Sequence, residues 1–269
     1  MSSPTDPPAF ETLALERIDE HVTVVRLNRP EASNALNTQM GRDLVRAFED
    51  VALDPGSLRC MVLTGAGDKA FCAGGDLKER RGMSDEQWTR QHVIFERMVR
   101  ALIDCPVPII GAVNGAAYGG GCEIAGACDF LYAADTARFA LTEVTLGIMP
   151  GGGGTQTLPR AVGERRAKEL ILTGKPFTAA QARDWGLVNE VFPLSDLLRE
   201  ALATASRIAR NAPISVRQAK LAIHRGLQSS LRDGLALEIE AYNRMVPTED
   251  RREGVLAFNE KRPPDFKGR

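Results

Sequence analysis

The fold is decided by one long stretch, residues 107–155, which reads VPIIGAVNGAAYGGGCEIAGACDFLYAADTARFALTEVTLGIMPGGGGT. It opens with a nearly continuous apolar run over residues 107–113, which is typical of a strand buried on both faces of a sheet. Gly119, Gly120 and Gly121 follow, and we interpret the Ala-, Cys- and Ile-rich segment after them as a buried helix. Glycine lets a backbone N–H approach a ligand closely, and the first N–H groups of a helix have no intrahelical partner. The turn is therefore a candidate cradle for an oxyanion or a phosphate.

Two glutamates accompany this turn. Glu123 lies just inside the predicted helix, and Glu143 follows after two short predicted strands, at residues 129–133 and 138–141. Each has a structural explanation when taken alone, because Glu123 can complement the helix dipole and Glu143 can cap an element or face solvent. Both interrupt apolar sequence, where a solvated charge is out of place. Together they predict a paired-carboxylate site beside the glycine turn.

The other glycine-rich segments do not match nucleotide-binding motifs. GAGDKAF at residues 65–71 lacks the third glycine of a dinucleotide fingerprint, and no Gly-Lys-Ser/Thr follows the glycines at residues 151–154. The latter run instead predicts a second tight backbone approach at the start of a helix.

Composition limits the class of protein. The 269 residues are enough for one large domain, or for a domain with an appendage. A net charge of −1 gives no electrostatic reason to expect nucleic acid or an anionic membrane as the main partner. No apolar run reaches the roughly 20 residues of a spanning helix. The first residues lack the basic region of a signal peptide, so we expect no targeting segment and a disordered tail over residues 1–9.

Cysteine and histidine usage argues against a metal or redox centre. The five cysteines form no CxxC pair and occur in apolar contexts, which predicts reduced, buried thiols in a cytoplasmic protein. The three histidines are scattered, and none falls at ligand spacing. We therefore expect no metal site and no cofactor.

Two segments within the opening stretch carry a family resemblance. AYGGGCEIAGACDF at residues 117–130 and FALTEVTLGIMPGGGGTQ at residues 139–156 resemble the signature region of the crotonase superfamily, the enoyl-CoA hydratases and isomerases. The residues themselves predict a wound α/β architecture, because strand-turn-helix units recur through the first two thirds of the chain. The resemblance implies the details: a superhelix of ββα turns over residues 10–200, followed by a C-terminal α-helical trimerisation region over residues 201–269.

The resemblance also assigns roles to particular residues. FCAGGDL at residues 71–77 resembles the motif that supplies the first oxyanion donor, here the Ala73 N–H, and the second donor matches Gly120. Glu123 matches the residue that polarises the attacking water, and Glu143 matches the donor of the C2 proton. The implied substrate- and coenzyme-A-binding residues are Ala35, Leu36, Ala73, Gly74, Asp76, Leu77, Gly119, Gly120, Phe258 and Lys261.

NRPEASNALN at residues 28–37 has two interpretations. From the residues alone it is a turn followed by a helix cap, with Asn37 or Thr38 as the capping residue. The resemblance adds that the backbone around Ala35 lies near the adenine of coenzyme A. Ser33 stands where many relatives carry a basic residue, so one phosphate contact is not expected here.

Two carboxylates favour a hydratase. Addition of water to a conjugated thioester requires one group that activates water at C3 and another that delivers a proton to C2. Isomerases of this fold usually keep only the second carboxylate. The expected enzyme is thus an enoyl-CoA hydratase, a hydro-lyase. A Δ3-Δ2 enoyl-CoA isomerase, or another acyl-CoA lyase or hydrolase, is the alternative.

A narrower alternative is a methylglutaconyl-CoA hydratase, which FCAGGDLKER, PGGGGTQTLPRAVG and VPTEDRREGVLAFNEKRPPDFKG resemble. A carboxylated substrate requires a basic pocket residue, and Lys78, Arg80 and Arg81 are nearby in sequence. Some members of this branch bind AU-rich RNA through a lysine-rich helix that matches residues 37–53. Acidic residues offset the arginines there, so nucleic-acid binding is not expected.

The last part of the chain predicts self-association. Residues 197–210, 214–226 and 231–245 are helical in pattern, with more apolar residues than one small bundle needs. The resemblance implies a homotrimer or a hexamer, whose C-terminal tail covers a neighbour's coenzyme-A site. Phe258 and Lys261 match positions that border coenzyme A in such assemblies.

Overall fold

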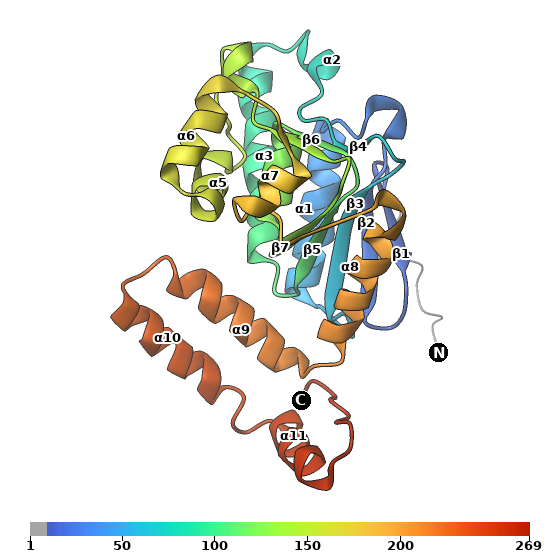
Figure 1. Ribbon diagram of the computed structural model, residues 1–269, viewed down its shortest axis with the longest axis vertical. Helices are drawn as coiled ribbons and strands as arrows, with labels where there is room; N and C mark the ends of the chain where they lie inside the picture. The colour runs from blue at the N-terminus through green and yellow to red at the C-terminus, as the bar shows by residue number, and fades with distance from the viewer. Residues whose placement is uncertain (1–9) are drawn as a thin grey trace.

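The computed structural model describes residues 10–269 and contains two sheets (Figure 1). The disordered tail predicted at residues 1–9 lies outside the described residues. The larger sheet has the order β1-β2-β3-β5-β7-β10 and is parallel except for the β1-β2 pair. Its strands are β1 (Leu13–Arg17), β2 (Val22–Leu27), β3 (Cys60–Gly65), β5 (Ile109–Val113), β7 (Phe130–Ala134) and β10 (Glu190–Phe192).

The smaller sheet, ordered β4-β6-β8-β9, carries the functional site at its strand ends. Its strands are β4 (Ala70–Cys72), β6 (Ala116–Tyr118), β8 (Arg138–Ala140) and β9 (Phe177–Thr178). The neighbours β4, β6 and β8 are parallel, while β9 pairs antiparallel with β8. Because parallel strands end at the same edge, residues that follow β4, β6 and β8 come together.

The ββα superhelix expected from the resemblance is confirmed. The pairs β3-β4, β5-β6 and β7-β8 each place one strand in each sheet, and a helix follows each pair. The helices of the core are α1 (Thr38–Leu53), α2 (Leu77–Arg80), α3 (Asp85–Asp104), α4 (Gly120–Ala127), α5 (Gly154–Val162), α6 (Glu164–Thr173), α7 (Ala179–Asp184) and α8 (Leu194–Ala209), with 3₁₀ turns η1 (Pro30–Ala32) and η2 (Glu143–Leu146).

The predicted buried strand at residues 107–113 begins two residues late, at Ile109, because Pro108 has no N–H to donate to a ladder. Every residue of β5 is buried, as its apolar sequence predicts. The strand predicted at residues 129–133 is β7, which begins at Phe130. Asp129 instead precedes the strand. Its Oδ2 accepts hydrogen bonds from the Ile109 N–H (2.7 Å) at the start of β5 and from Lys220 Nζ (2.7 Å).

The C-terminal helices leave the core after α8. That helix spans residue 200 and packs on the larger sheet, so the chain departs only at α9 (Pro213–Gly226). Helices α9 and α10 (Leu231–Asn243) form an antiparallel pair that extends away from the sheets and leads to α11 (Glu249–Glu260) (Figure 1). No helix within residues 10–269 is both long enough and apolar enough to cross a membrane.

The turn at residues 33–37 is organised by buried Asn34, which has a positive φ of 55°. Its Oδ1 accepts the Arg29 N–H (3.0 Å), and its Nδ2 donates to the carbonyls of Ala66 (3.0 Å) and Ala70 (2.9 Å). Asn37 caps α1 through a hydrogen bond from the Met40 N–H. The interpretation of NALN as a turn and a cap is confirmed, and the turn holds β4 against β3.

Asn34→Ala is expected to lower the free energy of unfolding by roughly 2–4 kcal/mol, because three buried or partly buried backbone groups lose their partner and alanine disfavours positive φ. Denaturant unfolding followed by circular dichroism measures the change. Asn211→Ala, at an exposed position, is the control and is expected to stay within about 0.5 kcal/mol. A loss below about 1 kcal/mol for Asn34→Ala contradicts this role.

Candidate active site

A cavity of about 640 Å³ opens where β4, β6 and β8 end. One wall is the backbone of the glycine turns and the two glutamates, and the facing wall is apolar. The apolar wall comes from α3, from the end of η2 and from the loop after η2, and its main residues are Trp88, Phe95, Met98, Val99, Leu146 and Ile148. The cavity thus places a polar, hydrogen-bonding edge against a surface suited to a hydrocarbon chain.

The glycine turn at the start of α4 is built around Gly119, which has a φ of 50°. A Cβ there would lie 3.2 Å from Glu143 Oε1, and a Cβ on Gly74 would lie 2.7 Å from the Tyr118 carbonyl oxygen. The segments after β4 and β6 therefore touch through their glycines. Gly120 is the first residue of α4, so its N–H has no intrahelical acceptor and remains available to a ligand.

The prediction that the Ala73 N–H is an oxyanion donor is corrected by the structure. That N–H already donates to the Ser33 carbonyl at 3.1 Å, because the turn at residues 33–37 pairs with the segment after β4. Two residues later, the Gly75 N–H has no acceptor within residues 10–269. The Gly75 nitrogen lies 3.9 Å from the position of a Cβ on Gly120. The adjacent donors are therefore Gly75 and Gly120.

Glu123 is held by the second glycine run. Its Oε1 accepts hydrogen bonds from the Gly152 N–H (2.7 Å) and the Gly154 N–H (2.9 Å). A Cβ on Gly152 would lie 2.7 Å from Glu123 Oε2, so the tight backbone approach predicted for residues 151–154 is made to this carboxylate. Burial raises the pKa of Glu123, while the two N–H groups and the nearby Arg80 charge oppose the rise.

Glu143 is the first residue of η2 and occupies a different environment. Its Oε2 is buried and has no hydrogen-bond partner within residues 10–269. Burial raises the pKa of Glu143 to about 7, and the charge of Glu123 contributes in the same direction. One carboxylate is thus bridged by two N–H groups, whereas the other has a free oxygen and titrates near neutrality. This difference allows the pair to divide acid and base roles.

The predicted coenzyme-A residues fall into three groups. Six of them line the cavity: Leu36, Ala73, Gly74, Leu77, Gly119 and Gly120. Two are held by Arg29 instead, since its Nη1 donates to the Ala35 carbonyl (2.7 Å) and to Asp76 Oδ2 (2.9 Å). The last two, Phe258 and Lys261, lie at the end of α11 and do not reach the cavity of their own chain. Phe258 is 83% exposed.

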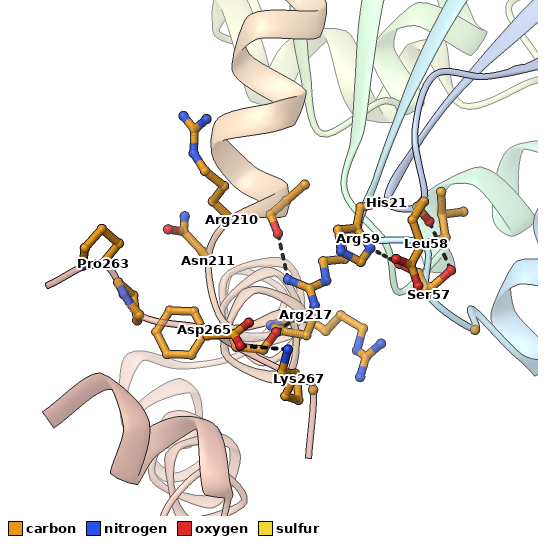
Figure 2. Close-up of a pocket in the computed structure, with 17 residues that line it drawn as sticks. His21, Ser57, Leu58, Arg59, Arg210, Asn211, Arg217, Pro263, Asp265 and Lys267 are labelled. Atoms are coloured by element: carbon orange, nitrogen blue, oxygen red, sulfur yellow. Dashed lines mark hydrogen bonds and ion pairs between the residues drawn. The ribbon is translucent and has the colours of Figure 1, made fainter. Parts of the chain in front are cut away.

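A second cavity, of about 660 Å³, lies where the C-terminal segment joins the core (Figure 2). Arg59 spans it, donating from Nη1 to the Ala209 carbonyl (2.9 Å) and from Nη2 to the Phe266 carbonyl (2.8 Å). Of the two acidic residues that line it in the described part of the chain, Glu20 and Asp265, Asp265 is paired with Lys267 (2.7 Å), and the Arg59 hydrogen bonds make this region a structural connection between the core and the C-terminal segment. Within residues 10–269 no cluster of His, Cys, Asp or Glu is arranged to hold a metal ion.

The two-sheet superhelix, together with the first cavity and its two glutamates, defines a protein of the crotonase superfamily, as the resemblance implied. The family model described as enoyl-CoA hydratase/isomerase matches residues 17–269, and the chain belongs to that family.

Named relatives are similar over nearly their whole length. The chain is 42% identical over 249 residues to the short-chain-enoyl-CoA hydratase of Clostridium acetobutylicum, covering 92% of this chain and 95% of the relative. It is 41% identical over 259 residues to the 2,3-dehydroadipyl-CoA hydratase of Escherichia coli, covering 93% and 96%. The crystal structure of an enoyl-CoA hydratase from Bacillus anthracis superposes with a TM-score of 0.94 at 44% identity, covering 96% of this chain and 100% of that chain.

Proposed function

We propose that the protein is an enoyl-CoA hydratase, which adds water across the C2–C3 double bond of a trans-2-enoyl-CoA to give a 3-hydroxyacyl-CoA. The observation that carries this proposal is the pair of buried glutamates in one cavity, with unlike hydrogen-bond environments. An isomerase requires one proton-transferring carboxylate, whereas hydration requires two groups acting on neighbouring carbons.

The backbone donors suit the charge that develops during hydration. Attack of water at C3 pushes electron density onto the thioester oxygen, which becomes enolate-like. The N–H groups of Gly75 and Gly120, which have no acceptor within residues 10–269, are proposed to receive that oxygen. Preorganised donors of this kind each contribute roughly 10²–10³-fold in rate. The oxyanion hole is thereby assigned to Gly75 rather than Ala73.

The two glutamates are proposed to act on opposite ends of the double bond. Glu123, fixed through Oε1, leaves Oε2 to orient and polarise the water that attacks C3 and to accept the proton which that water loses. Glu143, whose pKa is raised to about 7, is protonated in about half of the molecules at pH 7, and this form delivers the proton from its free oxygen to C2. No step of this reaction calls for a metal ion or a redox cofactor, because the thioester activates the double bond.

Loss of the conjugated thioester absorbance with crotonyl-CoA tests the proposal, with formation of 3-hydroxybutyryl-CoA as the product readout. A parallel assay with a trans-3-enoyl-CoA detects isomerisation, and 3-methylglutaconyl-CoA tests the methylglutaconyl-CoA hydratase alternative. Hydration of crotonyl-CoA faster than isomerisation supports the hydratase. Isomerisation without hydration, in a folded sample that binds coenzyme A, overturns it.

The pH dependence of kcat/KM follows from the raised pKa of Glu143. The donor must be protonated in the free enzyme, so kcat/KM is expected to fall as the pH rises through about 7, by about tenfold per pH unit at its steepest. Initial rates with crotonyl-CoA between pH 5.5 and 9 measure the profile. A kcat/KM that is flat from pH 6 to 9 contradicts a proton-donating role for Glu143.

Assembly into a homotrimer, or a hexamer of two trimers, is proposed because the C-terminal helices expose apolar side chains. The exposed set on α9, on α10 and between them includes Ile223, Leu227, Leu231, Leu235 and Ile239. Phe258 and Lys261 are far from their own cavity, and we propose that they border coenzyme A bound to a neighbouring subunit. All five cysteines are free thiols, which supports a cytoplasmic location.

Lys261→Asn is expected to raise KM for crotonyl-CoA roughly tenfold with little change in kcat, because a charge-assisted contact to coenzyme A is lost. Asparagine is chosen because Lys261 has a φ of 56°, a conformation that asparagine tolerates. Lys175→Asn, at an exposed position on the core, is the control. An unchanged KM in a variant whose light-scattering mass is still that of a trimer removes Lys261 from the coenzyme-A site.

A further inference from the structure

Arg80 is the one arginine or lysine among the described residues that line the cavity, and the proposed hydration chemistry does not use it. Of the three basic residues near this point in the sequence, Arg80 lines the cavity, whereas Lys78 and Arg81 do not. Arg80 is the last residue of α2 and is half-buried. Its guanidinium lies against Trp88 and Phe95 of the apolar wall, and the presence of a charge there requires an explanation.

The guanidinium of Arg80 is fixed through its Nε atom, which we call its inner edge; Nη1 and Nη2 form its outer edge. Arg80 Nε donates to Gln91 Oε1 at 2.8 Å, and Gln91 is only 2% exposed. Gln91 Nε2 in turn donates to Thr38 Oγ1 (2.8 Å) and Glu79 Oε2 (2.8 Å). A buried amide with both of its ends occupied sets the position of the arginine head. The orientation of Arg80 is thus built into the contacts among α1, α2 and α3.

Aromatic side chains support the plane of the same group. The Arg80 Cζ atom lies 4.4 Å from the ring centre of Trp88 and 5.5 Å from that of Phe95. Both rings belong to the apolar wall. Stacking of this kind leaves the in-plane N–H groups of an arginine available for a planar, two-oxygen partner.

The outer edge of Arg80 has no such partner. Within residues 10–269 no group accepts a hydrogen bond from Nη1 or Nη2, and no carboxylate forms an ion pair with them. Nη1 lies 3.1 Å from the position of a Cβ on Gly75, which places it beside the proposed oxyanion donor. Burial lowers the pKa of Arg80, and the charges of Glu79, Glu123 and Glu143 oppose that effect. A half-buried guanidinium whose two terminal nitrogens lack an acceptor in the described part of the protein is available to a planar anionic ligand.

We propose that Arg80 is the receptor for a carboxylate carried on the substrate's acyl chain, so that the preferred substrates are monothioesters of unsaturated dicarboxylic acids. The proposal rests on the hydratase function proposed above. Glu123 and Glu143 define the position of C2 and C3, and Arg80 lies close enough for its charge to act on both glutamates. The geometry favours a carboxylate a few carbons beyond C3, held by two parallel N–H···O bonds from Nη1 and Nη2.

The opposing explanation is that Arg80 only offsets the charge of the two glutamates. That role requires the positive charge of Arg80 but not its unpaired Nη1 and Nη2 groups. Its effect on the rate is the same for every substrate. A receptor role, in contrast, changes the ratio between a carboxylated substrate and a neutral one of the same shape. The ratio of kcat/KM values separates the two explanations, because an effect of Arg80 on the glutamates cancels in it.

The matched pair of substrates is trans-glutaconyl-CoA and trans-5-methyl-2-hexenoyl-CoA, in which an isopropyl group replaces the carboxylate. We expect the wild-type protein to favour glutaconyl-CoA, and Arg80→Met to lower the kcat/KM ratio by about 10²-fold. Arg80→Lys keeps the charge without the fork and is expected to recover only part of the ratio. Arg81→Met, at an exposed position outside the cavity, is the control and is expected to keep the wild-type ratio.

Calorimetric binding of the saturated analogues glutaryl-CoA and 5-methylhexanoyl-CoA gives a readout independent of turnover. Tighter binding of glutaryl-CoA by wild type, lost in Arg80→Met, supports the receptor. A wild-type preference for the neutral substrate, or an Arg80→Met variant that loses activity equally on both, overturns it and leaves the hydratase proposal intact. A folded wild-type protein that hydrates neither substrate instead contradicts the hydratase function itself.

Discussion

Glu143→Gln is expected to lower kcat for crotonyl-CoA hydration by roughly 10²–10⁴-fold. Glutamine preserves the size of the side chain and fits the same buried site, but its amide has no proton acidic enough to deliver to C2. The buried Oε2 of Glu143, which has no partner within residues 10–269, is the atom whose chemistry is removed. Steady-state rates from the decay of the enoyl-thioester absorbance measure the effect.

Binding of coenzyme A provides the control for Glu143→Gln, because the substitution leaves the glycine turns and the apolar wall in place. The dissociation constant is expected to change by no more than about twofold, so that the loss lies in kcat rather than in binding. The variant is also expected to stop exchange of the C2 protons of butyryl-CoA with D₂O. A variant with wild-type kcat and wild-type exchange excludes Glu143 from the proton transfer.

Glu123→Gln is expected to lower kcat by a similar factor, roughly 10²–10⁴-fold, for a different reason. The glutamine carbonyl can still accept the hydrogen bonds of Gly152 and Gly154, so the side chain is expected to stay where it is. What is lost is the negative charge that polarises the attacking water. Hydration rates and coenzyme-A affinity are measured as for Glu143→Gln.

The exchange assay distinguishes the two glutamates. Because Glu143 alone transfers the C2 proton in the proposed mechanism, Glu123→Gln is expected to retain exchange of the butyryl-CoA C2 protons while it loses hydration. Glu143→Gln is expected to lose both. Loss of exchange in Glu123→Gln with retention in Glu143→Gln would reverse the proposed roles, even if both variants fail to hydrate crotonyl-CoA.

Sequence patterns predicted the parts of this site that depend on local composition. The apolar run at residues 107–113, the glycines before α4 and the two charges in apolar surroundings each reflect a requirement of one short segment. The structure places the glycines and both glutamates together in one cavity, as the crotonase resemblance implied, while the apolar run forms the buried strand β5 behind them in the larger sheet. The cap at Asn37 was also predictable, because its side chain acts on the N–H of Met40, only three residues away.

The parts that sequence did not predict depend on contacts between distant segments. The sequence FCAGGDL does not show which of its backbone N–H groups is free to bind a ligand. The structure does, because the Ala73 N–H already donates to the Ser33 carbonyl. The sequence also did not predict that the glycines at residues 151–154 bind Glu123. The two segments are separated by a full turn of the superhelix, and only the fold brings them together. Lys78, Arg80 and Arg81 were equivalent candidates in the sequence. Of these three, only Arg80 donates to the buried amide of Gln91, and this hydrogen bond holds its head in the cavity.

The parallel trio β4, β6 and β8 has a consequence for how such proteins diversify. Gly75, Gly120 and Glu143 each follow one of these strands by two or three residues, so every turn of the superhelix supplies one chemical part. Replacing the side chain of Glu143 leaves the N–H donors of Gly75 and Gly120 in place, because both donors are backbone groups. New reactions can therefore arise by exchanging a single part on an unchanged frame, and laboratory evolution of this chain is best directed at one strand end at a time.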